Sequence, residues 1–162
     1  MLVVSDATPI HYLVLIDEIH LLRELYGRIV IPEAVVKELS VPKTPSAVRN
    51  WIASMPEWTS VGTIRRPASL PFASLGLGER QAIALARKSR RSILLTDDLK
   101  ARNAAESVNI QVVPTIRVLS AASALSLLDL EDALRRLQQT NFRVAREIID
   151  QILHPPSAEP SK

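Results

Sequence analysis

The sequence predicts an α/β fold in which a central parallel sheet of four to five strands is covered by helices on both faces. Short apolar runs of strand length alternate with segments of helical periodicity, and the links between them are short. This alternation is typical of a three-layer α/β/α arrangement, because parallel strands need crossover connections, which helices usually provide. The predicted strands are residues 2–4, 28–31, 58–61, 93–95 and 110–113.

The helices are predicted from start and stop signals that lie between these strands. Thr8 is placed to cap the first helix, with Pro9 at its first helical position. A second helix restarts at Asp17 and ends at Gly27, and Pro32 opens a third. The other predicted helices are residues 46–55, 79–88, 98–106, a segment from 115, 130–138 and 142–153.

We expect one domain, because 162 residues can bury one substantial core and are too few for two. The core unit is predicted to span residues 1–124. Residues 125–153 are expected to be a helical extension of the same domain. Residues 154–162 contain three prolines and two serines and are interpreted as a disordered tail.

The composition excludes several classes of protein. No apolar run approaches the roughly 18 residues of a membrane span, and residues 1–4 lack the basic region of a signal peptide, so we expect a cytoplasmic protein without membrane contact. The sequence has no cysteine, which excludes disulfides, thiolate catalysis and cysteine-bound metals. Any metal ion must therefore bind oxygen or imidazole ligands.

The charge distribution favours a polyanionic partner. The formal net charge is +3, and one stretch carries five basic residues without an acid. Such a cluster is also compatible with an ordinary solvated helix face. Its members are Arg80, Arg87, Lys88, Arg90 and Arg91.

Acidic residues recur at the ends of the predicted elements, namely at Asp6, Glu38, Glu79 and the pair Asp97–Asp98. Taken singly, most of them are explained by helix capping. In a parallel sheet, however, neighbouring strands release their carboxyl ends at the same edge, so the acids that follow strands should converge. Two carboxylates about 4 Å apart repel by roughly 4 kcal/mol at an effective dielectric constant near 20. A hard divalent cation would offset this repulsion, and it would support phosphodiester hydrolysis.

Four motifs in this order resemble the PIN-domain ribonucleases, which include the VapC-like toxins of type II toxin–antitoxin pairs. The similarity covers about residues 2–120 and extends the expected fold to a PIN-like catalytic domain over residues 1–124. The motifs are Val-Ser-Asp-Ala-Thr-Pro at 4–9, Ile-Pro-Glu-Ala-Val-Val-Lys-Glu-Leu at 31–39, Gly-Glu-Arg-Gln-Ala-Ile-Ala-Leu-Ala at 78–86 and Leu-Leu-Thr-Asp-Asp at 94–98.

The resemblance implies an endoribonuclease that uses Mg²⁺ or Mn²⁺ and leaves a 5′-phosphate and a 3′-hydroxyl. It implies that Asp6 and Asp98 bind the metal directly and that Glu38 and Glu79 complete the acidic pocket. An RNA substrate, an antitoxin protein and a homodimer are the partners it implies. We interpret Asp6, Glu38, Glu79 and Asp98 as catalytic, Asp6, Asp98, Glu79 and Asp97 as metal ligands, and Thr8, Thr96, Arg80 and Arg102 as weaker RNA contacts.

Two other hypotheses remain open. The first is a catalytically weak or inactive PIN-like module that binds RNA or protein, since Ala7 stands where the family often has a hydroxyl residue. The second is a receiver-like phosphoacceptor that uses Asp98 or Asp6, although its acid pair would follow the first strand rather than a late one.

Overall fold

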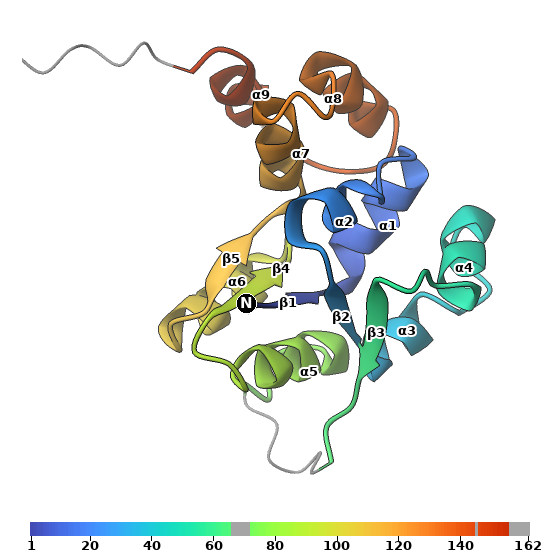
Figure 1. Cartoon of the computed structure of the whole chain (residues 1–162), viewed down its shortest axis with the longest axis vertical. Helices are drawn as coiled ribbons and strands as arrows, with labels where there is room; N and C mark the ends of the chain where they lie inside the picture. The colour runs from blue at the N-terminus through green and yellow to red at the C-terminus, as the bar shows by residue number, and fades with distance from the viewer. Residues whose placement is uncertain (66–71, 145, 156–162) are drawn as a thin grey trace, which may run out of the picture.

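A parallel sheet forms the centre of the molecule. The structure is a computed structural model that describes residues 1–65, 72–144 and 146–155. In this described part the sheet has five strands in the order β3-β2-β1-β4-β5, and all of the pairs are parallel (Figure 1). The predicted sheet is therefore confirmed. The strands are β1 Leu2–Ser5, β2 Ile29–Pro32, β3 Thr59–Gly62, β4 Ser92–Leu95 and β5 Gln111–Val113.

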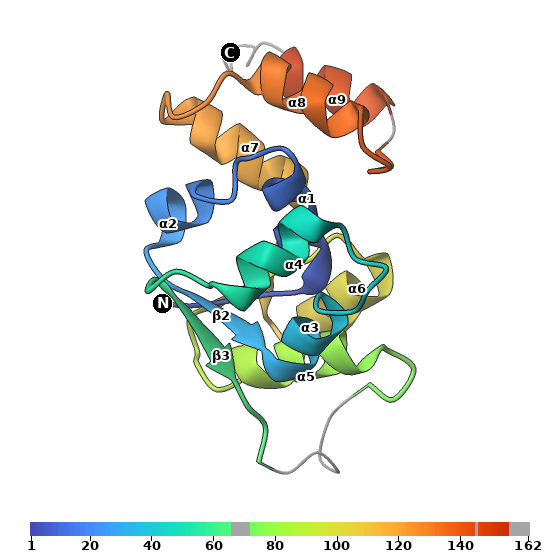
Figure 2. The ribbon, with the colours of Figure 1, turned by 90° about the vertical axis from the view of Figure 1, so that its right-hand side faces the viewer.

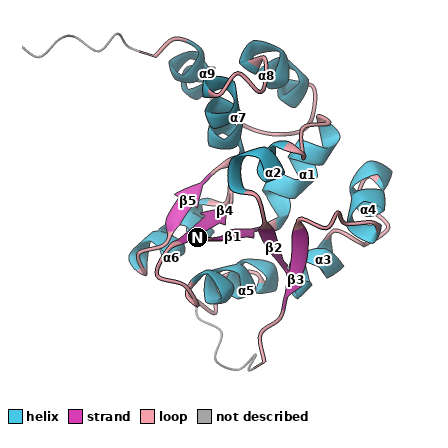
Figure 3. Cartoon of the chain, viewed as in Figure 1, coloured by secondary structure: helices cyan, strands magenta, loops and turns pink. Residues whose placement is uncertain are grey.

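Helices cover both faces of the sheet, as the three-layer prediction requires (Figure 3). Because side chains alternate along a strand, Val3 and Leu95 pack into one cluster with α1, α2, α4 and α7, whereas Val4 and Leu94 pack with α5 and α6. The helices are α1 Ala7–Leu15, α2 Leu21–Tyr26, α3 Glu33–Glu38, α4 Ser46–Ala53, α5 Leu77–Ala86, α6 Leu99–Ser107, α7 Thr115–Ala124, α8 Leu130–Gln138 and α9 Arg146–Leu153.

The strand order reverses between β1 and β4, because β2 and β3 lie on one side of this pair and β5 lies on the other. Ser5 is in register with Leu95, so the two strands end at the same level. The backbone N–H of Asp6 then donates to the carbonyl of Leu95 at 2.9 Å. Open α/β sheets bind ligands at such a reversal, outside the carboxyl ends of the strands.

The first two helices start differently from the predictions. The first helix begins at Ala7 and is capped by Asp6, whose side chain accepts from the N–H of Ala7, so the prediction of Thr8 as its cap is wrong. The second helix begins at Leu21 because Asp17, with a φ of 60°, interrupts the helical path. Its end at Gly27, with a φ of 77°, is as predicted.

The C-terminal helices pack onto the same side of the sheet as α7 (Figures 1 and 2). Helix α8 has the predicted bounds, and α9 begins at Arg146 rather than near Phe142. None of the helices in the described ranges is long and apolar enough to cross a membrane. Residues 156–162 of the predicted tail lie outside the described residues.

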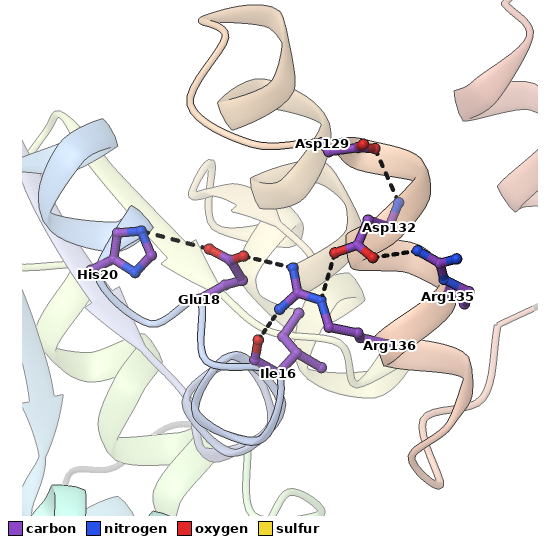
Figure 4. Close-up of polar contacts among 7 residues, drawn as sticks. All are labelled: Ile16, Glu18, His20, Asp129, Asp132, Arg135 and Arg136. Atoms are coloured by element: carbon purple, nitrogen blue, oxygen red, sulfur yellow. Dashed lines mark hydrogen bonds and ion pairs between the residues drawn. The ribbon is translucent and has the colours of Figure 1, made fainter.

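Arg136 joins α8 to the segment between α1 and α2 (Figure 4). Its guanidinium donates to Glu18 at 2.7 Å, to Asp132 at 2.9 Å and to the carbonyl of Ile16. His20 lies 3.6 Å from the other carboxylate oxygen of Glu18. The contacts of Arg136 with Ile16 and Glu18 connect residues more than 110 positions apart, so they fix the C-terminal extension to the core.

Arg136→Met is expected to destabilise the protein by about 1–3 kcal/mol, because it leaves the 14% exposed carboxylate of Glu18 and a backbone carbonyl without their guanidinium partner. Urea denaturation measures the change. The matched control is Arg135→Met, which removes a 67% exposed arginine that pairs with the same Asp132 and should cost less than about 0.5 kcal/mol. Equal losses in the two variants would contradict this role of Arg136.

Candidate functional site

Asp6 is the most buried acid at the carboxyl edge of the sheet, with 5% of the residue exposed. Its position follows from β1, which ends one residue earlier and delivers the carboxylate to the strand reversal. One carboxylate oxygen accepts from the N–H of Ala7 at 2.8 Å, and the other accepts from the hydroxyl of Thr96 at 2.9 Å. Asp6 is therefore held in place by both neighbouring strand ends.

Thr96 connects Asp6 with Asp98. Its hydroxyl donates to Asp6 and accepts from the backbone N–H of Asp98 at 3.3 Å. Thr96 is only 1% exposed, so the structure places this predicted RNA contact in a positioning role beneath the surface. Asp98 itself is exposed and caps α6 by accepting from the N–H of Ala101 at 2.8 Å.

Glu38 and Glu79 approach this edge because α3 and α5 pack closely together. A Cβ on Gly78 would lie 3.0 Å from a methyl group of Val35 and 3.3 Å from a carboxylate oxygen of Glu38, so glycine permits this approach. The side-chain carbonyl of Gln81 adds a link, since it accepts from the N–H of Ala34 at 2.9 Å. Glu79 accepts from the N–H of Gly76 at 2.9 Å and thereby caps α5.

The acids line adjoining clefts. A cleft of about 480 Å³ is lined by Asp6, Glu38 and Glu79, together with Thr8. A cleft of about 690 Å³ shares Thr8 and Glu79 with the first one and continues past Asp98. Asp6, Glu38 and Glu79 thus share one cleft, and Asp98 shares the adjoining cleft with Glu79.

The carboxylates influence one another electrostatically. Burial is the main cause that raises the pKa of Asp6 from 3.8 to about 7, and the charges of Glu79 and Glu38 raise it further against the opposing hydrogen bonds from Ala7 and Thr96. The pKa of Glu79 is also raised, chiefly by burial, with Asp98 and Glu38 adding to the effect. Negative charge at this site is therefore disfavoured unless a cation is bound.

The donor set suits a hard cation, because it consists of carboxylate oxygens without sulfur or imidazole ligands. Within residues 1–65, 72–144 and 146–155, however, no three acidic or histidine side chains form a group that could hold a metal ion. Asp6, Asp98 and Glu79 each turn one oxygen to an N–H at a helix start. The second oxygens of Asp98 and Glu79 accept no hydrogen bond from described residues.

Asp97, predicted as a further metal ligand, is held at the start of α7. Its two oxygens accept from the N–H of Thr115 at 2.8 Å and from the hydroxyl of Thr115 at 2.5 Å. Burial raises the pKa of Asp97, while the hydrogen bonds from Thr115 oppose this shift. The structure thus separates the adjacent acids, with Asp98 on α6 and Asp97 bonded to α7.

The predicted RNA contacts lie in different surroundings. Arg102 forms an ion pair with Glu106 at 3.2 Å and lines the larger cleft. Thr8 lines both clefts, and Arg80 is half-buried on α5. Sequence reasoning missed other residues of the larger cleft, because no motif marks them. These residues are Tyr12, Arg117, Asn141 and Arg143.

Asp6→Asn is expected to stabilise the metal-free protein at pH 8. Folding raises the pKa of Asp6, so the protonated side chain contributes to the stability of the native state. This contribution is complete below pH 3.8 and is lost as the pH rises towards 7. The gain of the variant over the parent should therefore be near zero at pH 4 and reach at most ~4 kcal/mol at pH 8.

Urea denaturation in the presence of a chelator, at pH 4 to 8, measures this difference. Asp129→Asn is the control, because it changes an exposed cap on α8 and should give no comparable gain. A parent protein that is more stable than Asp6→Asn at pH 8 without metal would refute the electrostatic argument.

The comparisons with known proteins agree with this geometry. A family model described as a PIN domain matches residues 2–157, which is nearly the whole chain. Comparison with curated proteins gave no match, and neither did comparison with solved structures. The parallel sheet and the acids at its carboxyl edge are features that the resemblance implied. On the match over nearly its whole length, the chain belongs to the PIN-domain family.

Proposed function

We propose that the protein is a metal-dependent endoribonuclease that hydrolyses RNA phosphodiester bonds. PIN domains are typically nucleases that bind Mg²⁺ or Mn²⁺, and membership of the family supports the proposal. The observation that carries it is the proximity of four acids at the strand reversal, namely Asp6, Glu38, Glu79 and Asp98. The charges of two other acids raise the pKa of Asp6, and those of two other acids raise the pKa of Glu79.

In this proposal Asp6 and Asp98 hold the ion, and Glu79 and Glu38 complete its surroundings. A bound Mg²⁺ or Mn²⁺ supplies a Lewis acid for the phosphoryl oxygen and lowers the pKa of a coordinated water. Thr96 orients Asp6 and the backbone of Asp98 through its hydroxyl. The burial of Asp6 strengthens its attraction to a cation, because opposite charges interact more strongly where solvent screening is weak.

We also propose that the protein is the toxin of a type II toxin–antitoxin pair. It rests on the resemblance to VapC-like toxins, together with the expected homodimer and the expected antitoxin partner. The basic surface from Arg87 to Arg91 supports contact with a polyanion, since its arginines are exposed. Growth inhibition on expression would test this part separately from cleavage.

A second candidate is a PIN-like module that binds RNA or protein without turnover. The specific observation in its favour is that Asp6, Asp98 and Glu79 all cap helices, so their positions have a structural explanation that needs no metal. Calorimetry with Mn²⁺ distinguishes the two candidates, because the binding module requires no metal affinity. Absence of Mn²⁺ binding together with intact RNA binding would favour this second function.

Purified protein supplied with Mn²⁺ is expected to cleave RNA internally and to leave 5′-phosphate and 3′-hydroxyl ends. Asp98→Asn should reduce the rate by about 10²- to 10³-fold, which corresponds to several kcal/mol of lost transition-state stabilisation. Gel analysis with end-specific enzymes measures both the rate and the ends. Failure to cleave any of a panel of RNAs with either metal, although the protein is folded, would count against the nuclease.

Asp97→Ala is expected to reduce mainly the stability of the protein, whereas Asp98→Ala is expected to reduce mainly its affinity for Mn²⁺. Asp97→Ala leaves the buried N–H and hydroxyl of Thr115 unpaired and should cost about 1–3 kcal/mol of stability, with little change in Mn²⁺ affinity. Asp98→Ala loses a cap worth about 1 kcal/mol but should lower Mn²⁺ affinity by about 10-fold or more. Calorimetric titration and denaturation measure both quantities. Equal losses of affinity would make Asp97 a ligand.

A further inference from the structure

We infer that the C-terminal extension forms one wall of a groove for single-stranded RNA, in which Arg117 and Arg143 bind phosphates next to the acidic site. This inference rests on the proposed function and names residues outside the acidic motifs. The groove is the cleft of about 690 Å³, whose lining includes Asp98 and Glu79 as well as residues 141–144 from the segment between α8 and α9. Two acids of the candidate site, Glu79 and Asp98, and the two arginines thus line the same cleft.

The wall is held to α1 by specific contacts. The hydroxyl of Tyr12 donates to the side-chain carbonyl of Asn141 at 2.8 Å, and the ring of Tyr12 meets Phe142 edge to face with centroids 4.8 Å apart. Thr8 and Tyr12 are one turn apart on α1, so they share a face of the helix. This face leads from Thr8, which also lines the acidic cleft, to the C-terminal segment.

Two of the arginines in the groove carry charges that no described residue neutralises. The side chains of Arg117 and Arg143 are exposed, and neither forms a hydrogen bond or ion pair within the described part of the chain. Arg143 lies near enough to Tyr12 to lower the pKa of its phenol, against the larger effect of burial. Arg102, the third arginine of the cleft, is partly neutralised by Glu106. A ligand with several anionic groups is the complement of such a surface.

A single RNA strand satisfies all parts of this groove. One phosphate would reach the acids through a bound cation, and neighbouring phosphates would reach the guanidiniums. The half-buried rings of Tyr12 and Phe142 lie in the same groove, and positive charge beside aromatic rings is typical of proteins that bind single strands. A single strand can place its bases against these rings, whereas a duplex keeps its bases paired and stacked inside the helix.

The test is RNA binding by the full chain in a chelator, where cleavage cannot proceed, measured by fluorescence anisotropy with a labelled single strand and the matching duplex. Arg117→Gln/Arg143→Gln should weaken single-strand binding by about 10-fold and reduce the slope of log affinity against log salt by about 1.4, at about 0.7 per lost phosphate contact. The matched control is Arg23→Gln/Arg28→Gln, which removes two exposed arginines from a separate hollow of about 400 Å³. It should change affinity less than 2-fold.

The outcomes separate this inference from the nuclease. Equal losses in the two double variants, no loss in either, or preference for the duplex would overturn the groove, whatever the cleavage assay shows. Selective loss in Arg117→Gln/Arg143→Gln supports the groove, even if the parent neither binds Mn²⁺ nor cleaves RNA, which would overturn only the nuclease. Binding of poly-glutamate through Arg117 and Arg143 without binding of RNA would overturn the inference in favour of an acidic protein segment.

Discussion

The hydrogen bonds that join the ends of β1 and β4 are the constraint on which the site depends. Asp6 is bonded to Leu95 through its backbone and to Thr96 through its side chain, and Thr96 also accepts from Asp98. The register that pairs Ser5 with Leu95 is enforced by burial, because a slip of one residue would turn every core side chain of β1 to the opposite face. The hydrophobic core therefore positions the acids, although it contributes no chemistry to the site.

Capping and cation binding are compatible uses of the same carboxylates. A helix N-terminus favours negative charge, so the starts of α1, α5 and α6 help to hold Asp6, Glu79 and Asp98 close to one another against their repulsion. Each carboxylate oxygen can accept more than one contact, which leaves capacity for a ligand. The raised pKa of Asp6 shows that the caps offset only part of the cost of its burial. A cation would supply the remainder, and this links the folding of the site to its proposed function.

The sequence was sufficient to predict the sheet and the acidic edge, because both follow from local patterns: apolar runs mark the strands, and acids at their ends share an edge in a parallel sheet. The roles of Asp97 and Asp98 were harder to separate, since they are adjacent and the orientation of Asp97 depends on Thr115, 18 residues later. The bond between Tyr12 and Asn141 spans 129 residues, so no local pattern indicates it. The cap of α1 was misassigned to Thr8 because a hydroxyl residue before proline gives the same signal as Asp6.

The two long-range attachments of the C-terminal extension both reach the first helix and the loop after it. Arg136 binds Ile16 and Glu18, and Asn141 accepts from Tyr12. The acids themselves are held independently of this extension, through β1, β4 and the starts of three helices. The structure thus separates two parts of the proposed function. The core positions the acids that would bind metal and also carries Arg117 on α7, and the extension positions Arg143 and the segment of residues 141–144. Helix α1 begins beside Asp6 and carries Tyr12 on its second turn. It is therefore the element that sets the distance between the acidic site and the C-terminal segment.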